Sequence, residues 1–323
     1  MTATRWGVIS TARINDKVLA GAALSDEVDV LAVASRDQAH AEAYAREHGI
    51  PRAYGGYDAL LADNDVEAVY ISLPNSFHCE WSIRALEAGK HVLCEKPMSR
   101  RPAEVEAVFD TAEAVDRFCM EAFMWRHNPQ TRKLQELLGD GAIGELRLVR
   151  AGFTFPLTDL GNVRMRPELE GGGLMDVGCY TVSGSRLLAG EPVRVTAQQV
   201  VGSTGVDVRL VGTLAFPGEV LAHIDCALDL PDRSELEAIG SDGSITVGDP
   251  WHCVRPGLTL RRGDEVEAVE IEPENSYKLE LENLGRAIRG EGHPLLGRED
   301  ALGQARTIEA LYRAAETGEA VEL

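Results

Sequence analysis

Residues 5–15 read R-W-G-V-I-S-T-A-R-I-N, a short apolar segment that leads through small residues into Ile14. In an α/β chain this is the place of the G-x-G-x-x-G loop, whose glycines let the backbone approach a dinucleotide pyrophosphate at a helix N-terminus. Here the three glycine positions hold Ser10, Ala12 and Asn15. All three are small, and asparagine tolerates unusual backbone angles. The segment alone leaves two interpretations open, a nucleotide-binding loop and a plain strand–helix turn.

The first 120 residues alternate short apolar segments with amphipathic ones. The pattern predicts strands at 5–10, 28–34, 66–73, 91–94 and 117–121, and helices near 14–24, 37–48, 77–88 and 102–115. Glycines end two of these helices, and Pro102 fits the first turn of the last one. Because parallel strands need crossover helices, the alternation predicts a doubly wound parallel sheet, the Rossmann arrangement.

Beyond residue 140 the periodicity changes to strict alternation of apolar and polar residues. It predicts strands at 144–156, 193–201, 206–216, 219–228, 234–240 and 266–271, and helices at 175–189, 276–290 and 298–316. Such alternation is typical of a large, open, mostly antiparallel sheet with one covered face, within an α+β domain. We place the boundary near 122–130 and divide the chain into residues 1–122 and 123–323.

The chain has 323 residues and a formal net charge of −20, from 52 acidic and 32 basic side chains. So acidic a surface disfavours nucleic acid and anionic membranes as partners. No apolar run approaches the roughly 18 residues of a membrane helix, and no basic-then-apolar leader opens the sequence. The six cysteines are scattered without a C-x-x-C pair. We therefore expect a soluble cytoplasmic protein without a metal site.

The end of the second predicted strand, A-V-A-S-R-D, bears on the cofactor. A NAD site places an acidic residue about 20 positions after the glycine loop, at the ribose 2′-hydroxyl. Here Ser35 and Arg36 stand at the strand end, and a guanidinium with a hydroxyl suits a 2′-phosphate. Taken alone, Arg36 is equally a solvated surface charge. Together with the loop at 5–15, the pair predicts NADP.

Two further loops follow the carboxyl ends of later strands, where open α/β sheets bind ligands. In Y-I-S-L-P-N-S-F-H (70–78), Asn75 is placed to bond a ribose and Pro74 shapes the loop. In H-V-L-C-E-K-P (91–97), Lys96 stands between a buried strand and a proline, and it is one of only five lysines in the chain. A lysine beside a hydroxyl acid lowers its pKa and orients a substrate.

The last motif is G-G-G-L-M-D-V-G-C-Y, residues 171–180. Asp176 and Tyr180 are four positions apart, so on a helix both project from one face. The preceding glycines allow the backbone to approach something flat or phosphorylated. The alternative is structural, with Asp176 as a charge at a helix N-terminus and Tyr180 as part of an amphipathic core.

Together these motifs resemble the glucose–fructose oxidoreductase / inositol dehydrogenase (Gfo/Idh/MocA) family over essentially the whole chain. Tyr180 and the W-G-x-x-S-T-A opening are most similar to the branch of NADP-dependent D-xylose 1-dehydrogenases and dimeric dihydrodiol dehydrogenases. Other branches have a histidine at this position, which disfavours inositol dehydrogenase. The resemblance rests on the opening segment, Ser35-Arg36, Glu95-Lys96-Pro97, E-A-F-M-W-R-H-N-P (121–129), the 171–180 motif and the closing P-L-L-G-R-E-D-A-L.

The resemblance implies a dinucleotide-binding domain over 1–122 and a substrate-binding and dimerisation domain over 123–323. It implies that Tyr180 is the general base beside the nicotinamide, that Lys96 favours the tyrosinate, and that Asp176 bonds a neighbouring hydroxyl. Implied cofactor contacts are Ser10, Thr11, Ala12, Arg13, Ile14, Ser35, Arg36, Leu73, Pro74, Asn75, His78, Glu95, Lys96, Trp125 and Arg126. Implied substrate contacts are Phe153, Phe155, Arg164, Asp176 and Tyr180, with core packing as the equal alternative for the two phenylalanines.

The hypothesis is an NADP-dependent oxidoreductase that acts on a sugar or cyclic polyol, with D-xylose oxidised at C1 as the best single substrate. A trans-dihydrodiol dehydrogenase and a ketosugar reductase use the same residues and stay open. A glycosidase with tightly bound NAD is disfavoured by Ser35 and Arg36. A non-catalytic NADP-binding sensor is disfavoured by the presence of Lys96, Asp176 and Tyr180. By analogy we expect a homodimer or higher homo-oligomer.

Overall fold

The computed structural model describes residues 3–323, which form two compact units. The first contains the chain through Met124 together with Asn275–Leu302, and the second contains Trp125–Glu274 and Gly303–Leu323. The expected division at 122/123 differs from this in two respects, the first being that it ends the first domain two residues before Met124. It also assigned residues 275–302 to the second domain, whereas they return to the first.

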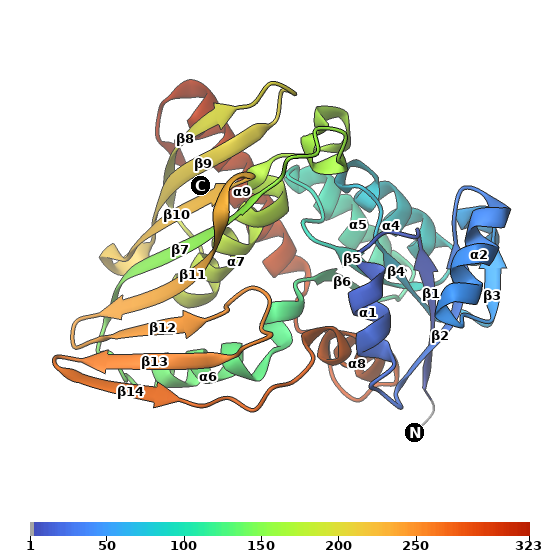
Figure 1. Ribbon diagram of the computed structural model, residues 1–323, viewed down its shortest axis with the longest axis horizontal. Coiled ribbons are helices and arrows are strands. Elements are labelled where there is room, and N and C mark those ends of the chain that lie inside the picture. The colour runs from blue at the N-terminus through green and yellow to red at the C-terminus, as the bar shows by residue number, and fades with distance from the viewer. Residues whose placement is uncertain (1–2) are drawn as a thin grey trace. The chain divides into compact units, whose positions relative to one another are not determined.

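The first unit is built on a parallel sheet with the strand order β3-β2-β1-β4-β5-β6 (Figure 1). The order reverses between β1 and β4, and ligands of doubly wound sheets bind at such a switch point. The predicted doubly wound parallel sheet is therefore confirmed. The strands are β1 (Thr4–Ile9), β2 (Val28–Ala34), β3 (Arg52–Tyr54), β4 (Ala68–Ile71), β5 (His91–Glu95) and β6 (Cys119–Ala122).

Helices pack against both faces of this sheet, so the central strands are buried throughout and appear in the sequence as nearly continuous apolar segments. Gly49, with φ +69°, ends α2 as predicted, and Pro102 opens α5. The strand β3 and the helix α3 were missed, because each is too short to show a periodicity. The helices are α1 (Asn15–Ala22), α2 (Gln38–His48), α3 (Tyr57–Leu61), α4 (His78–Glu87) and α5 (Pro102–Ala114).

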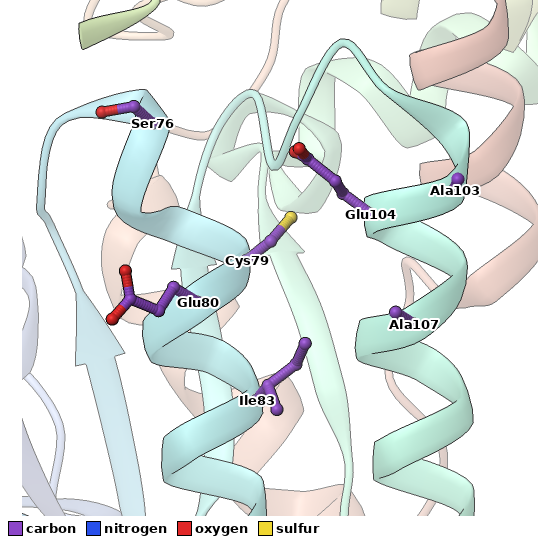
Figure 2. A pocket seen from close by; sticks show the side chains of 7 residues that line it. All are labelled: Ser76, Cys79, Glu80, Ile83, Ala103, Glu104 and Ala107. Atoms are coloured by element: carbon purple, nitrogen blue, oxygen red, sulfur yellow. The ribbon is translucent and has the colours of Figure 1, made fainter.

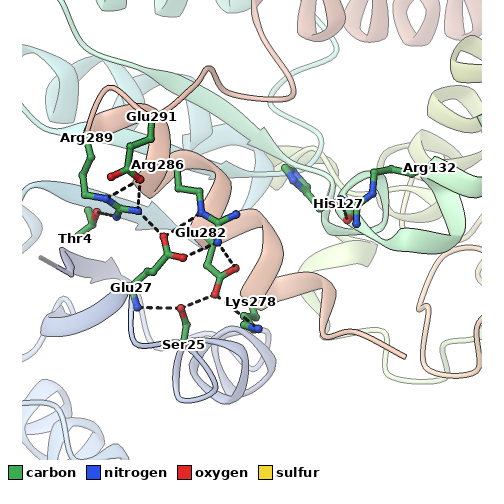
Figure 3. A network of polar contacts seen from close by, with 10 residues as sticks. All are labelled: Thr4, Ser25, Glu27, His127, Arg132, Lys278, Glu282, Arg286, Arg289 and Glu291. Carbon is green, nitrogen blue, oxygen red and sulfur yellow. Dashed lines mark hydrogen bonds and ion pairs between the residues drawn. The ribbon is translucent and has the colours of Figure 1, made fainter. Parts of the chain in front are cut away.

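Helix α8 (Ser276–Ile288) belongs to the first unit because it packs against α1. The approach is close: a Cβ added at Gly21 would lie 2.7 Å from the backbone nitrogen of Lys278. Glu27 then accepts hydrogen bonds from both Arg286 and Arg289 (Figure 3). These bonds, that from Arg286 foremost, lower the pKa of Glu27 although burial opposes the shift.

The second unit contains a nine-stranded mixed sheet with the order β14-β13-β12-β11-β7-β10-β9-β8-β15 (Figure 1). Only β7 and β10 pair in parallel among the described strands of this sheet, and all its other pairs are antiparallel. The expected mostly antiparallel sheet is confirmed. Its strands are β7 (Leu146–Pro156), β8 (Arg194–Val201), β9 (Asp207–Ala215), β10 (Leu221–Ala227), β11 (Asp229–Gly240), β12 (Ser244–Gly248), β13 (Gly257–Arg262), β14 (Glu265–Val269) and β15 (Val321–Glu322).

Three strands and one α-helix of the second unit were not predicted from the sequence: β12, β13, β15 and α6 (Pro129–Gly139). The helix expected at 175–189 begins with a π-helical turn, Leu174–Gly178, before α7 (Cys179–Ala189). Helix α7 covers one face of β7, β10 and β11. The last helix, α9 (Arg298–Thr317), starts within the first unit and continues in the second, where Leu311 packs on Gly212 of β9. No helix within residues 3–323 combines the length and apolar character needed to cross a bilayer.

Candidate functional site

The loop after β1 is a tight turn built on Ser10, which has φ +100° although it is not a glycine. Its hydroxyl lies 2.8 Å from the hydroxyl of Ser72 and accepts from the backbone N–H of Ala12. The buried Asn15 donates to the Ser10 carbonyl at 2.9 Å. Side-chain hydrogen bonds therefore hold the left-handed conformation that a glycine adopts without strain. Ser10 and Ser72 also join the loops after β1 and β4, the two strands at the switch point.

The N-terminus of α1 offers backbone donors that no group in residues 3–323 uses. Within residues 3–323, no acceptor takes the N–H groups of Thr11, Arg13 or Ile14, and no side chain caps the helix. Such a terminus binds anions, because unpaired N–H groups and the helix dipole both favour negative charge. Arg13 adds an exposed guanidinium beside the turn. The loop therefore fits a pyrophosphate in spite of its missing glycines.

At the end of β2, Ser35 is buried and its backbone N–H donates to the carbonyl of Tyr54 on β3. Arg36 is exposed, and its guanidinium has no hydrogen bond or ion pair in the described part of the chain. The nearest acid in sequence, Asp37, caps α2 by accepting from His40 N at 2.8 Å. An unpaired arginine at this strand end fits a 2′-phosphate better than a 2′-hydroxyl.

The loop after β4 contains Leu73, Pro74 and Asn75, of which the last two are half-buried. His78 is the first residue of α4. It is buried, and its ring nitrogens lie 2.8 Å from the carbonyl oxygen of Leu73 and 2.9 Å from that of Pro97. Burial also lowers its pKa. Both ring nitrogens therefore face backbone carbonyl oxygens, and His78 ties the loops after β4 and β5 together.

The loop after β5 is fixed by two acids, the half-buried Glu95 and the buried Glu121. Tyr70 of β4 donates to Glu95 at 2.6 Å, and the other carboxylate oxygen of Glu95 accepts from the backbone N–H of Lys96. Glu121 of β6 accepts from the backbone N–H of Met98 at 2.7 Å. With the His78 contact, these bonds hold the segment around Lys96 from both neighbouring strands.

Glu280 of α8 faces this same part of the first unit and was not anticipated. Its carboxyl is 0% exposed, and neither oxygen has a hydrogen-bond partner within residues 3–323. Burial, reinforced by the charge of Glu95, raises the pKa of Glu280 well above its ordinary value. Burial and the same two acids also raise the pKa of Tyr70. The cluster of Tyr70, Glu95 and Glu280, beside the loop that carries Lys96, is therefore acidic and poorly hydrated.

A surface cavity of about 380 Å³ lies between α4 and α5. Figure 2 shows Cys79 of α4 and Glu104 of α5 pointing toward one another across it. Its lining includes two carboxylates, Glu80 and Glu104, and no basic side chain. It therefore does not fit an anionic dinucleotide, and none of the predicted site residues lines it.

In the second unit, Asp207 of β9 fixes the start of the 174–189 helical segment. Its carboxylate accepts from the backbone N–H of Leu174 at 2.7 Å and from the hydroxyl of Tyr312 at 2.9 Å. Gly172 has φ +122°, and a Cβ there would collide with the Asp207 carboxylate. The glycine run was expected to approach something flat or phosphorylated. It instead packs against Asp207 and, at Gly171, against the Arg164 carbonyl.

Asp176 is on the π-helical turn and Tyr180 is on the first turn of α7. Arg164 Nε lies 2.7 Å from Asp176 Oδ2, so two of the predicted substrate-binding side chains form an ion pair. Tyr180 is half-buried, and its ring is edge-on to Phe153 with centroids 5.5 Å apart. Of the substrate contacts expected from the sequence, the second unit thus pairs Arg164 with Asp176 and Phe153 with Tyr180.

An aromatic cluster surrounds Tyr180. The ring centroid of Trp251 lies 6.0 Å from that of Tyr180 and 5.2 Å from that of Trp125. The Trp251 indole N–H donates to the carbonyl of Gly152 at 3.0 Å. Trp125 is only 1% exposed, so it is a buried member of the cluster. Arg126 stacks over Trp125 and donates to Ser183. Phe155, two positions along β7 from Phe153, is half-buried.

The candidate residues fall into two groups, one in each unit. The loop residues from Ser10 to Lys96 belong to the first unit, and those from Trp125 to Tyr180 to the second. Asp207, Trp251, His252 and Glu280 were not predicted from the sequence. An acid between two apolar residues, V-D-V at 206–208, was a signal for Asp207. No group of His, Cys, Asp and Glu in the described chain has the arrangement of a metal site.

Comparison with known proteins is consistent with this division. A model described as an oxidoreductase family with an NAD-binding Rossmann fold matches residues 4–123, and a Gfo/Idh/MocA C-terminal domain model matches residues 131–246. The chain is 40% identical to D-xylose 1-dehydrogenase (NADP(+)) 2 of Haloferax volcanii, over 98% of this chain and 99% of that protein. It is 34% identical to the trans-1,2-dihydrobenzene-1,2-diol dehydrogenase of Danio rerio, over 82% of this chain and 80% of that protein.

Among solved structures, the 3-ketoreductase KijD10 from Actinomadura kijaniata, in complex with NADP and TDP-benzene, has a TM-score of 0.91 and 30% identity, with 97% of this chain and 98% of that chain covered. The aldose-aldose oxidoreductase from Caulobacter crescentus has a TM-score of 0.93 and 27% identity, with 99% and 100% covered. The fold and site thus define an oxidoreductase with a Rossmann domain. The chain belongs to the Gfo/Idh/MocA oxidoreductase family, and the resemblance seen in its motifs is confirmed.

Proposed function

We propose that the chain is an NADP-dependent oxidoreductase that oxidises a sugar or cyclic polyol, with D-xylose oxidised at C1 as its first-choice substrate. The observation that carries the proposal is the α1 N-terminus, whose backbone donors meet no protein acceptor within residues 3–323, together with the unpaired Arg36 at the end of β2. These groups supply an anion site for the pyrophosphate and a cation for a 2′-phosphate. The relative from Haloferax volcanii, whose name includes both NADP and D-xylose, supports the same assignment.

The proposed proton chemistry follows the roles that the family resemblance implies for Tyr180, Lys96 and Asp176. Tyr180 removes the proton of the substrate hydroxyl during oxidation and returns it during reduction. Tyrosine has an ordinary pKa of about 10, so it needs a neighbouring cation to act as a base near neutral pH. Lys96 supplies that charge and donates to the substrate oxygen. Asp176, held by Arg164, accepts from a neighbouring hydroxyl. When bound, the nicotinamide supplies the hydride acceptor or donor.

We propose that the solvent-exposed face of the second unit's sheet forms a homodimer or higher homo-oligomer. Val200, Val211 and Leu221, on β8, β9 and β10, are each about half exposed, which is unusual for large apolar side chains on three adjacent strands. We also propose a cytoplasmic location, which the six free cysteines support. The acidic charge argues against nucleic acid and anionic membranes as partners.

A trans-dihydrodiol dehydrogenase is the second candidate, because the cluster of Phe153, Trp251 and Tyr180 also suits a flat arene diol. A ketosugar reductase would use the same residues in the reverse direction. The three activities differ in the compound consumed and in the direction of the redox change, so one screen separates them.

The test measures formation of NADPH from NADP⁺ with aldoses, cyclic polyols and arene diols, and consumption of NADPH with ketosugars. Binding of NADPH and NADH is measured in parallel. The proposal predicts turnover of a sugar and tighter binding of NADPH. Tighter binding of NADH, or release of a chromogenic aglycone without added cofactor, would instead favour the NAD-dependent glycosidase. Bound NADPH that no compound oxidises would favour a sensor.

A further inference from the structure

The loop between β12 and β13, residues 249–256, places His252 beside the proposed substrate site. The His252 ring is edge-on to Phe153, with centroids 5.3 Å apart and an interplanar angle of 83°. The same Phe153 ring is edge-on to Tyr180 at 5.5 Å. His252 and Tyr180 therefore contact one aromatic ring, although 72 residues separate them in the sequence.

This loop is held by hydrogen bonds. The Asp249 carboxylate accepts from the backbone N–H groups of Val254 at 2.8 Å and Arg255 at 3.2 Å, and the Asp249 carbonyl accepts from Cys253 N–H. Asp249 and Cys253 have φ of +45° and +55°, a region that residues other than glycine rarely adopt. The loop therefore adopts its shape against local strain, which indicates that tertiary contacts fix it.

The far end of the loop is tied to α6. The side-chain oxygen of Gln130 accepts from the backbone N–H of Gly257 at 2.7 Å, and its amide nitrogen lies 3.9 Å from Cys253 Sγ. On the inner side, Trp251 is buried and bonded to the Gly152 carbonyl. His252 is thus flanked by two anchored residues, and its side chain is presented by a rigid segment.

The His252 side chain is nevertheless 48% exposed, and one of its nitrogens is available. Nδ1 lies 3.4 Å from Asp249 Oδ1, and an acceptor-only carboxylate favours the tautomer with the proton on Nδ1. Nε2 has no hydrogen-bond partner within residues 3–323. In that tautomer Nε2 is an acceptor, so a hydroxyl group that approaches it can donate a hydrogen bond.

We propose that His252 is a substrate-binding residue whose Nε2 accepts a hydrogen bond from a sugar hydroxyl distant from the carbon that Tyr180 serves. This inference rests on the proposed function and narrows its substrate class. A polyhydroxylated ring has a hydroxyl for both residues, whereas an arene diol presents only its two adjacent hydroxyls. The buried ring of Phe153 lies between the two residues and fixes where each of them stands.

The test compares wild type with His252→Phe, which keeps an aromatic ring against Phe153 but removes the nitrogen. Val254→Ala, at an exposed position of the same loop, is the matched control. Values of kcat and KM are measured for D-xylose and for its singly deoxygenated analogues, and Kd is measured for NADPH. A neutral hydrogen bond is worth about 0.5–1.5 kcal/mol, so we expect KM for D-xylose to rise about 2- to 13-fold with kcat little changed.

One deoxy sugar, lacking the hydroxyl that His252 bonds, is expected to have the same kcat/KM with both proteins. For His252→Phe, the Kd for NADPH and the melting temperature are expected to equal those of wild type. Val254→Ala is expected to match wild type in every one of these measurements. An unchanged KM for D-xylose would overturn the inference, and so would an equal loss for every sugar, which would make His252 structural. If wild type oxidises no sugar, the proposed function itself fails; if it does and His252→Phe matches it, only this inference fails.

Discussion

Asp207 offers a sharp quantitative test of how the second unit holds its helical segment. The side chain is 5% exposed, and it accepts from Leu174 N–H and Tyr312 O–H. Burial raises its pKa from the ordinary value of 3.8 to about 6, although the hydrogen bonds from Leu174 and Tyr312 oppose the rise. The folded protein therefore binds a proton at Asp207 more tightly than the unfolded chain does.

The sign of the pH dependence follows from this difference in proton binding. The stabilising contribution of a raised pKa is complete below pH 3.8 and is lost as the pH rises through about 6. The whole shift corresponds to about 3 kcal/mol, of which about 1.4 kcal/mol is lost between pH 5 and pH 8. In Asp207→Asn the side chain accepts the same bond from Leu174 without titrating, so this loss is absent.

The assay is urea unfolding of wild type and Asp207→Asn at pH 5 and at pH 8. The difference in unfolding free energy between the two proteins does not contain the pH dependence contributed by all the other acids, because both proteins share them. We expect the stability of wild type, relative to the variant, to fall by about 1.4 kcal/mol between the two pH values. Asp264→Asn, an exposed acid in the turn between β13 and β14, is the control and is expected to follow wild type. An equal difference at both pH values would refute the reasoning from burial.

Three further predictions concern the cofactor, the proton chemistry and the first unit. Arg36→Ala is expected to weaken NADPH binding by about 10- to 100-fold and to leave NADH binding unchanged, as titrations of each nucleotide will reveal, because only NADPH has the 2′-phosphate. Tyr180→Phe is expected to lower kcat by about 100-fold or more at unchanged Kd for NADPH, whereas full activity would remove Tyr180 from the mechanism. Glu280→Met is expected to raise the free energy of unfolding by about 1–3 kcal/mol at pH 8, because it removes a buried carboxyl without partners in the described chain; a less stable variant in urea unfolding would contradict this.

Much of the first unit could be predicted from local pattern. Parallel strands covered on both faces, such as β1 and β4, appear as apolar segments, and the loops that follow them are the sites of α/β folds. The short β3, whose residues are half-exposed, shows no such pattern. The return of α8 to the first unit was also unpredictable, because it depends on bonds from Arg286 and Arg289 to Glu27, some 260 residues away.

The candidate site divides in the same way. Lys96, Asp176 and Tyr180 stand in short motifs, so the sequence alone is enough to propose them as site residues. Asp207 accepts a hydrogen bond from Leu174, and His252 contacts Phe153. Both partners are distant in the sequence, so only the folded chain brings these pairs together. We expected the glycine run at 171–173 to approach something flat or phosphorylated. The group that Gly172 approaches is the carboxylate of Asp207.

In the proposed reaction a sugar carbon gives its hydride to NADP⁺ while Tyr180 takes the hydroxyl proton. The most decisive experiment uses D-xylose deuterated at C1, with NADP⁺ and the wild-type protein, followed by mass spectrometry of the nicotinamide product. The proposed reaction predicts NADPH that contains the deuterium, and almost no product with Tyr180→Phe. Unlabelled NADPH, or no NADPH from any aldose tested, would contradict it.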